Sequence, residues 1–262
     1  MTGLLLTVDI GNTNTVLGVH ADGELKVHWR LTTRREQTAD EYGILVRNLF
    51  ASSGVEPEAL GGVALASVVP PLTPVLVELA RQYLGQEPLV VEPGVRTGMP
   101  ILYEPPSDVG ADRIVNGVAA FAAFGGPVIV VDFGTATTFD VVTRKGEYAG
   151  GVICPGIGIS ADALFQRAAR LPRVDIRNPG RAIGRSTVTS IQSGLYFGYA
   201  SMVEGIIGRI RAEIPERARA IATGGMAAAL AGDIPSIEAV DPVLTLTGLR
   251  LIWERNRTST VS

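Results

Sequence analysis

One short pattern occurs twice in this sequence, and it constrains the fold more than any other feature. Residues 7–18 read TVDIGNTNTVLG, and residues 130–140 read VVDFGTATTFD. In each copy an apolar run ends in an aspartate, one further residue and a glycine, and small hydroxyl or amide residues follow. The apolar runs predict buried strands, and the glycines allow the backbone to turn tightly. Two copies of so unusual a phrase indicate an internal duplication.

The likeness between the two halves continues past the phrase itself. In the first half, residues 15–20 and 25–31 predict two strands joined at Asp22-Gly23, which is a turn signal. In the second half, residues 137–143 and 148–153 predict another pair of strands. Each half therefore begins with a buried strand, a carboxylate, a glycine and a hairpin.

Helical patterns follow each hairpin. Thr38, with Glu41 three residues later, predicts a capping box at the start of a helix over 38–54. In the second half, Ser160 is the expected N-cap of one helix, and a long helix is expected over 189–214. Alternating strands and helices indicate an α/β protein with helices covering the sheets. A helix near residues 113–125 is expected to join the two halves.

Composition narrows the class of protein. The 262 residues are 46% hydrophobic and 19% charged, which is enough for a substantial core in one large domain or two smaller ones. A net charge of −3 without a long basic run argues against a nucleic-acid surface. The sequence has no apolar run of the roughly 18 residues that a membrane span needs, and MTGLLLTV lacks the basic residues of a signal peptide. We therefore expect a soluble cytoplasmic protein.

The supply of metal-binding and nucleophilic side chains is small. Cys154 is the only cysteine, which excludes an internal disulfide and fits a reducing compartment. His20 and His28 are the only histidines, and neither has a partner at the spacing of a zinc site. We expect both to be ordinary strand residues, so a zinc enzyme or a Ser-His-Asp triad is improbable.

The repeated phrase suits the binding of phosphate. A strand delivers its aspartate at the carboxyl end of the sheet, and Gly11 and Gly134 let the backbone approach an anion closely. The short polar residues that follow offer N–H and O–H donors to phosphate oxygens. The sequence contains neither GxxxxGK[ST] nor GxGxxG, so two such hairpins facing each other are the only phosphate-binding device visible. The plainer alternative is a pair of ordinary β-turns.

The stretch GADRIVN, residues 110–116, suggests the acceptor side of a phosphoryl transfer. Asp112 and Asn116 lie on one face of a helix if the helix has begun, and Arg113 offers a planar fork for a carboxylate. An alcohol kinase needs a carboxylate that orients the hydroxyl and accepts its proton. The alternative is an exposed polar turn at the start of a helix.

These residues carry a family resemblance. The duplicated hairpins resemble those of the superfamily of actin, heat-shock chaperones and sugar kinases. Over nearly its whole length the chain is similar to type III pantothenate kinases, through phrases that occur in the family's order: DIGNTNTV, TADEYG, SVVPPL, TGMPILYEPPSDVGADRIVN, VVDFGTATTFDVV, GGVICPGIGISADALFQRAARLP, GRSTVTSIQSG, ATGG and DPVLTLTGLRLIWERN. The resemblance implies two duplicated ribonuclease H-like (actin-like ATPase) domains, over 1–117 and 118–262, with a nucleotide cleft between them.

The resemblance also assigns roles to single residues. The catalytic carboxylate would be Asp112. The ATP-binding residues would be Asp9, Ile10, Gly11, Asn12, Thr13, Asn14, Thr15, Val16 and Thr135, with ATGG on the adenosine side. The pantothenate-binding residues would be Tyr103, Gly110, Ala111, Asp112, Arg113 and Thr187, the last supplied by the partner subunit. Asp132 would hold a monovalent cation, K⁺ or NH₄⁺.

Local alternatives to three of these roles remain open. Tyr103 could be a partly buried loop aromatic, and Asp132 a carboxylate that caps nearby N–H groups. Thr187 could be a helix N-cap, with Thr189 and Ser190 as rivals.

The implied activity is the phosphorylation of pantothenate by ATP and Mg²⁺ to 4′-phosphopantothenate, the first step of coenzyme A synthesis. A homodimer is also implied. Gly194, Gly198 and Gly205 fit close helix–helix approach in a dimer, although internal packing is the plainer explanation. Two alternatives are a kinase of another small alcohol in the same superfamily and a non-catalytic, ATP-binding regulatory accessory factor.

Overall fold

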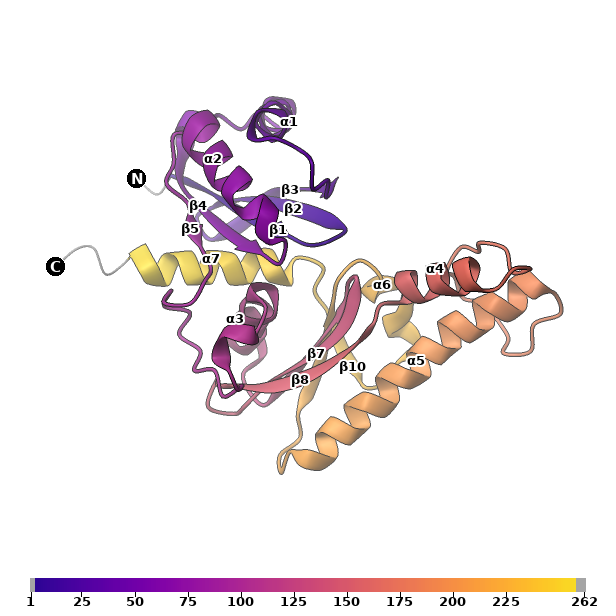
Figure 1. Cartoon of the computed structure of the whole chain (residues 1–262). Coiled ribbons are helices and arrows are strands. Elements are labelled where there is room, and N and C mark those ends of the chain that lie inside the picture. Colours follow the sequence, from indigo (N-terminus) through magenta and orange to yellow (C-terminus); the bar gives the residue numbers. More distant parts are fainter. Residues whose placement is uncertain (1–2, 258–262) are drawn as a thin grey trace. The chain divides into compact units, whose positions relative to one another are not determined.

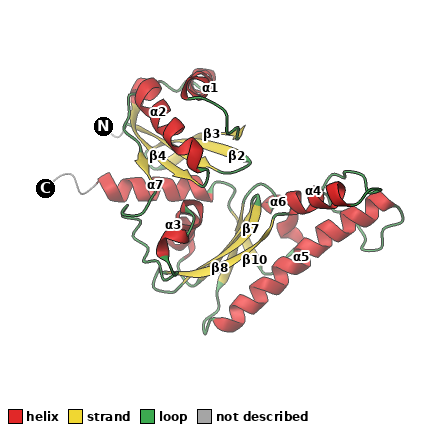
Figure 2. Ribbon diagram, in the orientation of Figure 1, coloured by secondary structure: helices red, strands yellow, loops and turns green. Residues whose placement is uncertain are grey.

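The computed structural model describes residues 3–257, and the chain divides into two compact units. Unit 1 contains residues 3–99, 103–119 and 244–257, and unit 2 contains residues 100–102 and 120–243. Unit 1 is thus discontinuous in sequence, because the chain returns to it at its carboxyl end. Figures 1 and 2 show the elements of each unit.

The sheet of unit 1 has five strands in the order β3-β2-β1-β4-β5. The strands are β1 (Leu4–Ile10), β2 (Asn14–Ala21), β3 (Glu24–Thr32), β4 (Leu60–Ser67) and β5 (Leu89–Val90). The first three form an antiparallel meander, whereas β4 runs parallel to β1 and β5 parallel to β4. The central strand β1 is buried along most of its length, as its apolar sequence predicts.

Helices cover both faces of this sheet. On one face lie α1 (Ala39–Ser52) and α2 (Thr73–Leu84), and on the other lies α7 (Leu244–Arg257) (Figures 1 and 2). The α1 and α2 helices complete a core in which Tyr42 and Phe50 are almost fully buried. The α7 helix approaches closely, because a Cβ built at Gly62 on β4 would lie 2.5 Å from the indole of Trp253.

The sheet of unit 2 repeats this order. Its strands are β6 (Val128–Phe133), β7 (Ala136–Val142), β8 (Tyr148–Pro155), β9 (Arg219–Thr223) and β10 (Ile237–Val240). They are arranged β10-β9-β6-β7-β8, with an antiparallel meander on one side of β6 and parallel strands on the other. When the strands of each unit are numbered in chain order and each sheet is read from its meander edge, both sheets have the order third, second, first, fourth, fifth. The predicted duplication is confirmed at the level of topology.

Unit 2 also has helices beside its sheet. They are α4 (Ile157–Arg167), the long α5 (Thr187–Glu213) and the single turn α6 (Ala227–Leu230). The α5 helix supplies Tyr196, Val203 and Ile207 to the core of this unit. Short 3₁₀ turns occur at Pro57–Ala59, Pro70–Leu72, Pro106–Asp108 and Ala231–Asp233. The α3 helix (Ala111–Phe124) begins in unit 1 and ends in unit 2, so it joins the two units as expected.

Local predictions about helix ends had mixed outcomes. The capping box of Thr38 and Glu41 is confirmed. The α4 helix begins at Ile157 with Gly156 as its N-cap, so Ser160 is not the cap; its backbone N–H already donates to Gly156 O inside the helix.

The N-cap of α5 is Ser186, which forms a capping box with Thr189. Neither Thr187, Thr189 nor Ser190 is therefore the N-cap. Sequence alone did not single out Ser186 because several neighbouring hydroxyl residues could all accept from a backbone N–H.

The division of the chain differs from the expected one at its carboxyl end. The predicted second domain spans 118–262, yet residues 244–257 form α7 and belong to unit 1. The physical reason is packing, since α7 covers the open face of β1 and β4. Within residues 3–257, no helix combines the length and the apolar character needed to cross a membrane.

Candidate active site

The first copy of the repeated phrase forms a tight loop at the carboxyl end of β1. Asp9 and Ile10 end the strand, and the Gly11 N–H donates to Asn14 O at 3.0 Å to close the turn. Asn12 and Thr13, between them, are exposed. The loop therefore presents its polar groups to solvent at the edge of the sheet where ligands of parallel strands bind.

A neighbouring segment holds this loop from the side. Thr33 Oγ1 donates to Gly11 O at 2.7 Å, and the Thr33 N–H donates to Thr13 O at 3.0 Å. Thr33 Oγ1 also lies 3.0 Å from the hydroxyl oxygen of buried Thr15. The Arg35 guanidinium donates to Asn12 Oδ1 at 3.1 Å. The sequence analysis did not single out Thr33 or Arg35, because their role depends on the pairing of β2 with β3.

Asp112 lies in the first turn of α3, where its carboxylate folds back over the start of the helix. Its Oδ1 accepts the Arg113 N–H at 2.8 Å. A Cβ built at Gly110 would lie 2.5 Å from that oxygen, so glycine makes room for the bend. Burial raises the pKa of the Asp112 carboxyl above its ordinary value, and hydrogen bonding and charge at Arg113 oppose part of that rise. The result is a carboxylate more basic than an exposed one.

The start of α3 and the first loop lie at the same edge of the unit 1 sheet. The Val68 N–H, just after β4, donates to Ile10 O at 3.1 Å. A Cβ built at Gly110 would in turn lie 3.5 Å from Val68 Cγ1. Val68 thus bridges the end of β1 and the segment that carries Asp112. The fold brings two carboxylates from residues 9 and 112 to the carboxyl ends of adjacent parallel strands.

Other expected substrate residues occupy varied environments. Arg113 is almost fully buried, and Tyr103 is partly buried in the loop before α3. Gly110 and Ala111 are partly buried at the start of that helix. Asn116 shares the helix with Asp112, but its Oδ1 accepts the Thr245 hydroxyl of α7 at 2.7 Å. Asn116 therefore fastens α3 to α7.

The second copy of the phrase forms a corresponding loop at the end of β6. The Gly134 N–H donates to Ala136 O at 3.1 Å, and Gly134 and Thr135 are exposed. The Gly156 N–H, at the start of α4, donates to Thr135 O at 3.0 Å. A Cβ at Gly156 would overlap that same oxygen. The backbone of α4 therefore packs directly against the loop.

Asp132 is the penultimate residue of β6 and lies beside the glycine pair that follows β9. It pairs with Thr138 on β7 and with Thr223 on β9. Gly224 has φ of +90°, and a Cβ there would overlap Asp132 Oδ1. A residue with a side chain would both strain the backbone and displace the carboxylate. The phrase ATGG thus serves at least to leave space for Asp132.

Thr187 lies in an open pocket of unit 2. The pocket measures about 520 Å³ and is lined by Leu164, Leu171, Thr187, Ser190, Ile191, Gly194 and Leu195, from α4, the following loop and α5. The Thr187 side chain is exposed at the first residue of α5. Most of the lining is apolar.

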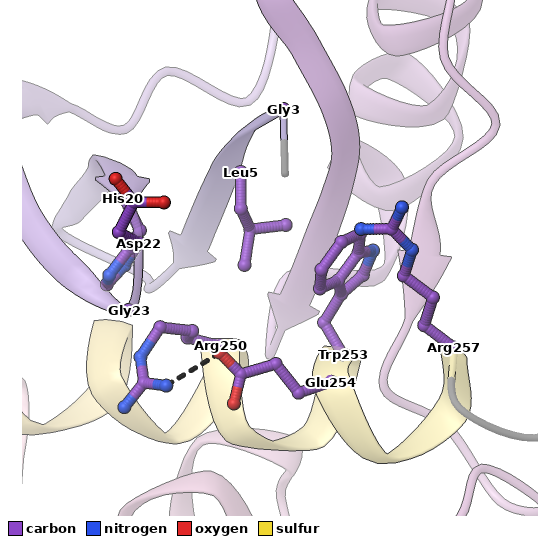
Figure 3. A pocket seen from close by; sticks show the side chains of 9 residues that line it. All are labelled: Gly3, Leu5, His20, Asp22, Gly23, Arg250, Trp253, Glu254 and Arg257. Carbon is purple, nitrogen blue, oxygen red and sulfur yellow. Dashed lines mark hydrogen bonds and ion pairs between the residues drawn. The ribbon is translucent and has the colours of Figure 1, made fainter. Parts of the chain in front are cut away.

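A second pocket, of about 410 Å³, lies at the other end of the unit 1 sheet (Figure 3). Residues at the amino end of β1, the β2–β3 turn and α7 line it, including Leu5, His20 and Trp253. Figure 3 also shows the ion pair of Arg250 with Glu254, whose atoms are 2.7 Å apart. None of the expected ATP or pantothenate residues lines this pocket, so it is separate from the candidate active site in unit 1.

Comparison with known protein families shows to which family this chain belongs. The family model for type III pantothenate kinases matches residues 5–209. The chain belongs to the type III pantothenate kinase family. A type III pantothenate kinase of Moorella thermoacetica is 55% identical over 97% of this chain and 100% of the relative. One of Koribacter versatilis is 54% identical over 98% of this chain and 97% of the relative.

Solved structures with a similar fold support the fold described for this member of the pantothenate kinase family. A structure described as a conserved putative Baf family transcriptional activator from Campylobacter jejuni matches with a TM-score of 0.57 and 19% identity, over 97% of this chain and 98% of that one. Component A of (R)-2-hydroxyglutaryl-CoA dehydratase from Acidaminococcus fermentans matches with a TM-score of 0.55 and 12% identity, over 99% of each chain. The fold is that of the actin-like ATPases, as the resemblance implied.

Proposed function

We propose that this protein transfers the γ-phosphoryl group of ATP to the primary hydroxyl of pantothenate, giving 4′-phosphopantothenate. The observation that carries the proposal is the placement of Asp112. A half-buried carboxylate of raised pKa stands at the same sheet edge as the first phosphate-type loop, in a chain of this family. The product would enter coenzyme A synthesis at its first step, and we place the reaction in the cytoplasm.

Asp112 acts in this proposal as the general base. The hydroxyl proton of pantothenate passes to the carboxylate while the oxygen forms a bond to the γ-phosphorus. The bond from that phosphorus to the β,γ-bridging oxygen breaks, and ADP leaves. Because the Arg113 N–H holds Oδ1, the carboxylate is oriented before substrate arrives. A base whose pKa is raised toward the working pH accepts a proton more readily in the transition state.

The remaining substrate contacts are proposed from where the other candidate residues lie. Arg113 supplies a guanidinium fork for the carboxylate of pantothenate, with Tyr103, Gly110 and Ala111 around the substrate. In ATP binding we propose that the loop over residues 9–16 and Thr135 donate N–H and O–H groups to the phosphates. The glycine pair after β9 would lie beside the adenosine.

Two cations complete the proposal. Mg²⁺ binds through few protein carboxylates and keeps phosphate and water ligands, which suits a single Asp9 at a strand end. Within residues 3–257, no three His, Cys, Asp or Glu side chains form a metal-binding group. Asp132 would hold K⁺ or NH₄⁺, and the space left by Gly224 gives its carboxylate room. Both ions would offset phosphate charge.

We also propose a homodimer that covers the exposed face of α4 and α5. Gly194, Gly198 and Gly205 on α5 are exposed, and a Cβ at any of them would meet nothing within 4 Å. Internal packing therefore does not explain these glycines. The apolar Ile183 is 82% exposed, and Phe165 is also exposed. A partner subunit on this face would bury these groups and place Thr187 near the partner's substrate.

The test is ADP release with MgATP and pantothenate in K⁺, comparing the wild type with Asp112→Asn. We expect pantothenate-dependent turnover that falls by about 100-fold or more in the variant, the size of a lost general base. Asp108→Asn is the matched control, because that carboxylate is exposed four residues upstream and should leave the rate unchanged.

The same assay separates the alternatives. ATP binding without pantothenate-dependent ADP release would favour a regulatory factor, and turnover with a different alcohol would favour another small-molecule kinase. Equal rates in Na⁺ and in K⁺ would contradict the role given to Asp132. Light scattering of the purified protein reports whether it is a dimer.

A further inference from the structure

The first loop is held by a short segment that the family phrase does not include. Three successive loop residues, Gly11, Asn12 and Thr13, each accept a hydrogen bond from Thr33 or Arg35. The segment is itself fixed on both sides. Thr32 pairs with Asn14 in the sheet before it, and the α1 capping box follows it. The fold therefore ties the Arg35 guanidinium to this loop.

Positive charge is scarce where the phosphates of ATP are expected. Neither copy of the repeated phrase contains a lysine or an arginine, and the only lysines of the sequence are Lys26 and Lys145. Lys26 lies near the far turn of the first hairpin and pairs with Glu24 at 2.6 Å. Lys145 lies in the turn between β7 and β8, away from the second loop. Neither lysine can do what the lysine of a P-loop does.

Arg35 can meet this need. Its side chain is exposed, and among residues 3–257 no carboxylate forms an ion pair with it. A guanidinium has five N–H donors, and the bond to Asn12 uses one of them. The remaining donors form a fork that suits phosphate oxygens.

The bond to Asn12 has a second consequence. Because Asn12 Oδ1 accepts from Arg35, the amide must direct its Nδ2 donors elsewhere. Asn12 is exposed on the loop, so these donors are available to an anion there. Arg35 thus sets which end of the Asn12 amide faces a bound phosphate.

We propose that Arg35 is a phosphate-binding residue for the triphosphate of ATP and that it orients the Asn12 amide toward the same phosphates. The inference rests on the proposed function only in placing ATP at the first loop. It adds a cationic group from outside the repeated phrase. The substrate class it recognises is a nucleoside triphosphate.

The experiment measures nucleotide binding without turnover, using calorimetry with the magnesium complex of a non-hydrolysable ATP analogue. Arg35→Ala should bind the analogue about tenfold or more weakly, as expected for the loss of a charge-assisted hydrogen bond to phosphate. Its affinity for adenosine, which has no phosphate, should not change. Arg35→Lys should recover part of the loss, because it restores charge without the fork that holds Asn12.

Arg34→Ala is the matched control. Arg34 is an exposed neighbour of equal charge, and the described residues show no hydrogen bond from its side chain to the loop. Its variant should bind both compounds as the wild type does. An equal loss for the analogue and for adenosine in Arg35→Ala would overturn the proposal, as would an unchanged affinity or the same loss in Arg34→Ala.

The outcome is separable from that of the proposed function. If the wild type fails to turn over pantothenate but analogue binding depends on Arg35, the inference stands while the proposed reaction fails. If turnover is normal in Arg35→Ala and analogue binding is unchanged, the reverse holds. In an active enzyme, the Arg35→Ala defect should appear in the KM for ATP and not in the KM for pantothenate.

Discussion

The two loops of the repeated phrase follow the first strand of equivalent sheets but have different supports. In unit 1 two side chains hold the loop, since Thr33 and Arg35 donate to Gly11 and Asn12, alongside the backbone bond from the Thr33 N–H to Thr13 O. In unit 2 the corresponding loop is held by backbone, through the Gly156 N–H to Thr135 O bond at the start of α4. The first turn is also one residue longer, because Gly11 bonds to Asn14 whereas Gly134 bonds to Ala136.

This difference shows how the supports of a duplicated motif can diverge while the motif keeps its place in the sheet. A side-chain hydrogen bond contributes about 1 kcal/mol and can be lost alone. Where the backbone packs without space for a Cβ, a substitution cannot remove one interaction alone, because any side chain must displace the backbone itself. The second loop should therefore be far less tolerant of substitution at its support than the first.

The largest effect should come from Gly156→Ala. Its Cβ would overlap Thr135 O and crowd Gly134 O, so α4 or the loop must move. We expect a loss of about 3 kcal/mol or more in the free energy of unfolding, the upper end for overpacking. Urea denaturation measures it. Gly158→Ala in the same helix is the control: nothing lies within 4 Å of its Cβ, and the change should be neutral or slightly stabilising. Equal effects would remove the contrast between the loops.

The strands that follow the two loops, β2 and β7, differ in the titratable group that each buries. On β7, Asp140 accepts the Tyr148 hydroxyl at 2.7 Å, whereas β2 buries His20. His20 Nε2 lies 3.1 Å from the Thr7 hydroxyl, whose proton goes to Gly18 O. Burial, followed by the charge of Arg250, lowers the pKa of His20 from 6.5 to about 4. The folded protein therefore holds this imidazole neutral where the unfolded chain would protonate it.

The free energy of unfolding should consequently fall as pH drops from about 6.5 to about 4. In that window the unfolded state binds the extra proton, and the loss should reach about 3 kcal/mol at most. Urea denaturation at several pH values measures it. His20→Gln, which keeps a donor for Thr7, should flatten the curve, and His28→Gln at an exposed position should not. The same slope in all three proteins would contradict a neutral buried His20.

The smallest effect should come from Thr33→Val in the first loop. The change removes the bond to Gly11 O and the contact with the Thr15 hydroxyl but keeps the backbone bond to Thr13. We expect a loss of about 1 kcal/mol in the free energy of unfolding, together with weaker binding of ATP. Thr32→Val, at an exposed neighbour on β3, is the control for denaturation and binding. A loss as large as that of Gly156→Ala would mean that side chains and backbone support the loops equally.

Much of the fold could be predicted because it depends on local pattern. The apolar runs before Asp9 and Asp132 predict buried strands, and both are central strands of their sheets. The capping box at Thr38 was readable because its two partners are three residues apart. The duplication was readable because equal local patterns fold into equal topologies. The actin-like fold and the family were readable from the order of many short phrases.

The candidate site could be predicted from the sequence only in part. The placement of Asp112 in the first turn of α3 follows from GADRIVN, but its back-folded carboxylate and raised pKa depend on Gly110 and on burial. Asn116 shares its helical face, yet the structure commits it to Thr245, 129 residues later. The roles in catalysis and in ATP, pantothenate and cation binding stay predictions.

The sequence by itself determined the strands, most helices and the duplicated order, since these follow from the periods and signals of neighbouring residues. The family was identified by the resemblance of its phrases, in their order, to a known family. Only the tertiary structure decided that α7 completes unit 1, that Thr33 and Arg35 hold the first loop, and that Gly156 and Gly224 leave room for the second loop and for Asp132. Each of these depends on a contact between segments distant in the chain. Such contacts are set by how faces pack and by where a Cβ fits, which no local pattern records.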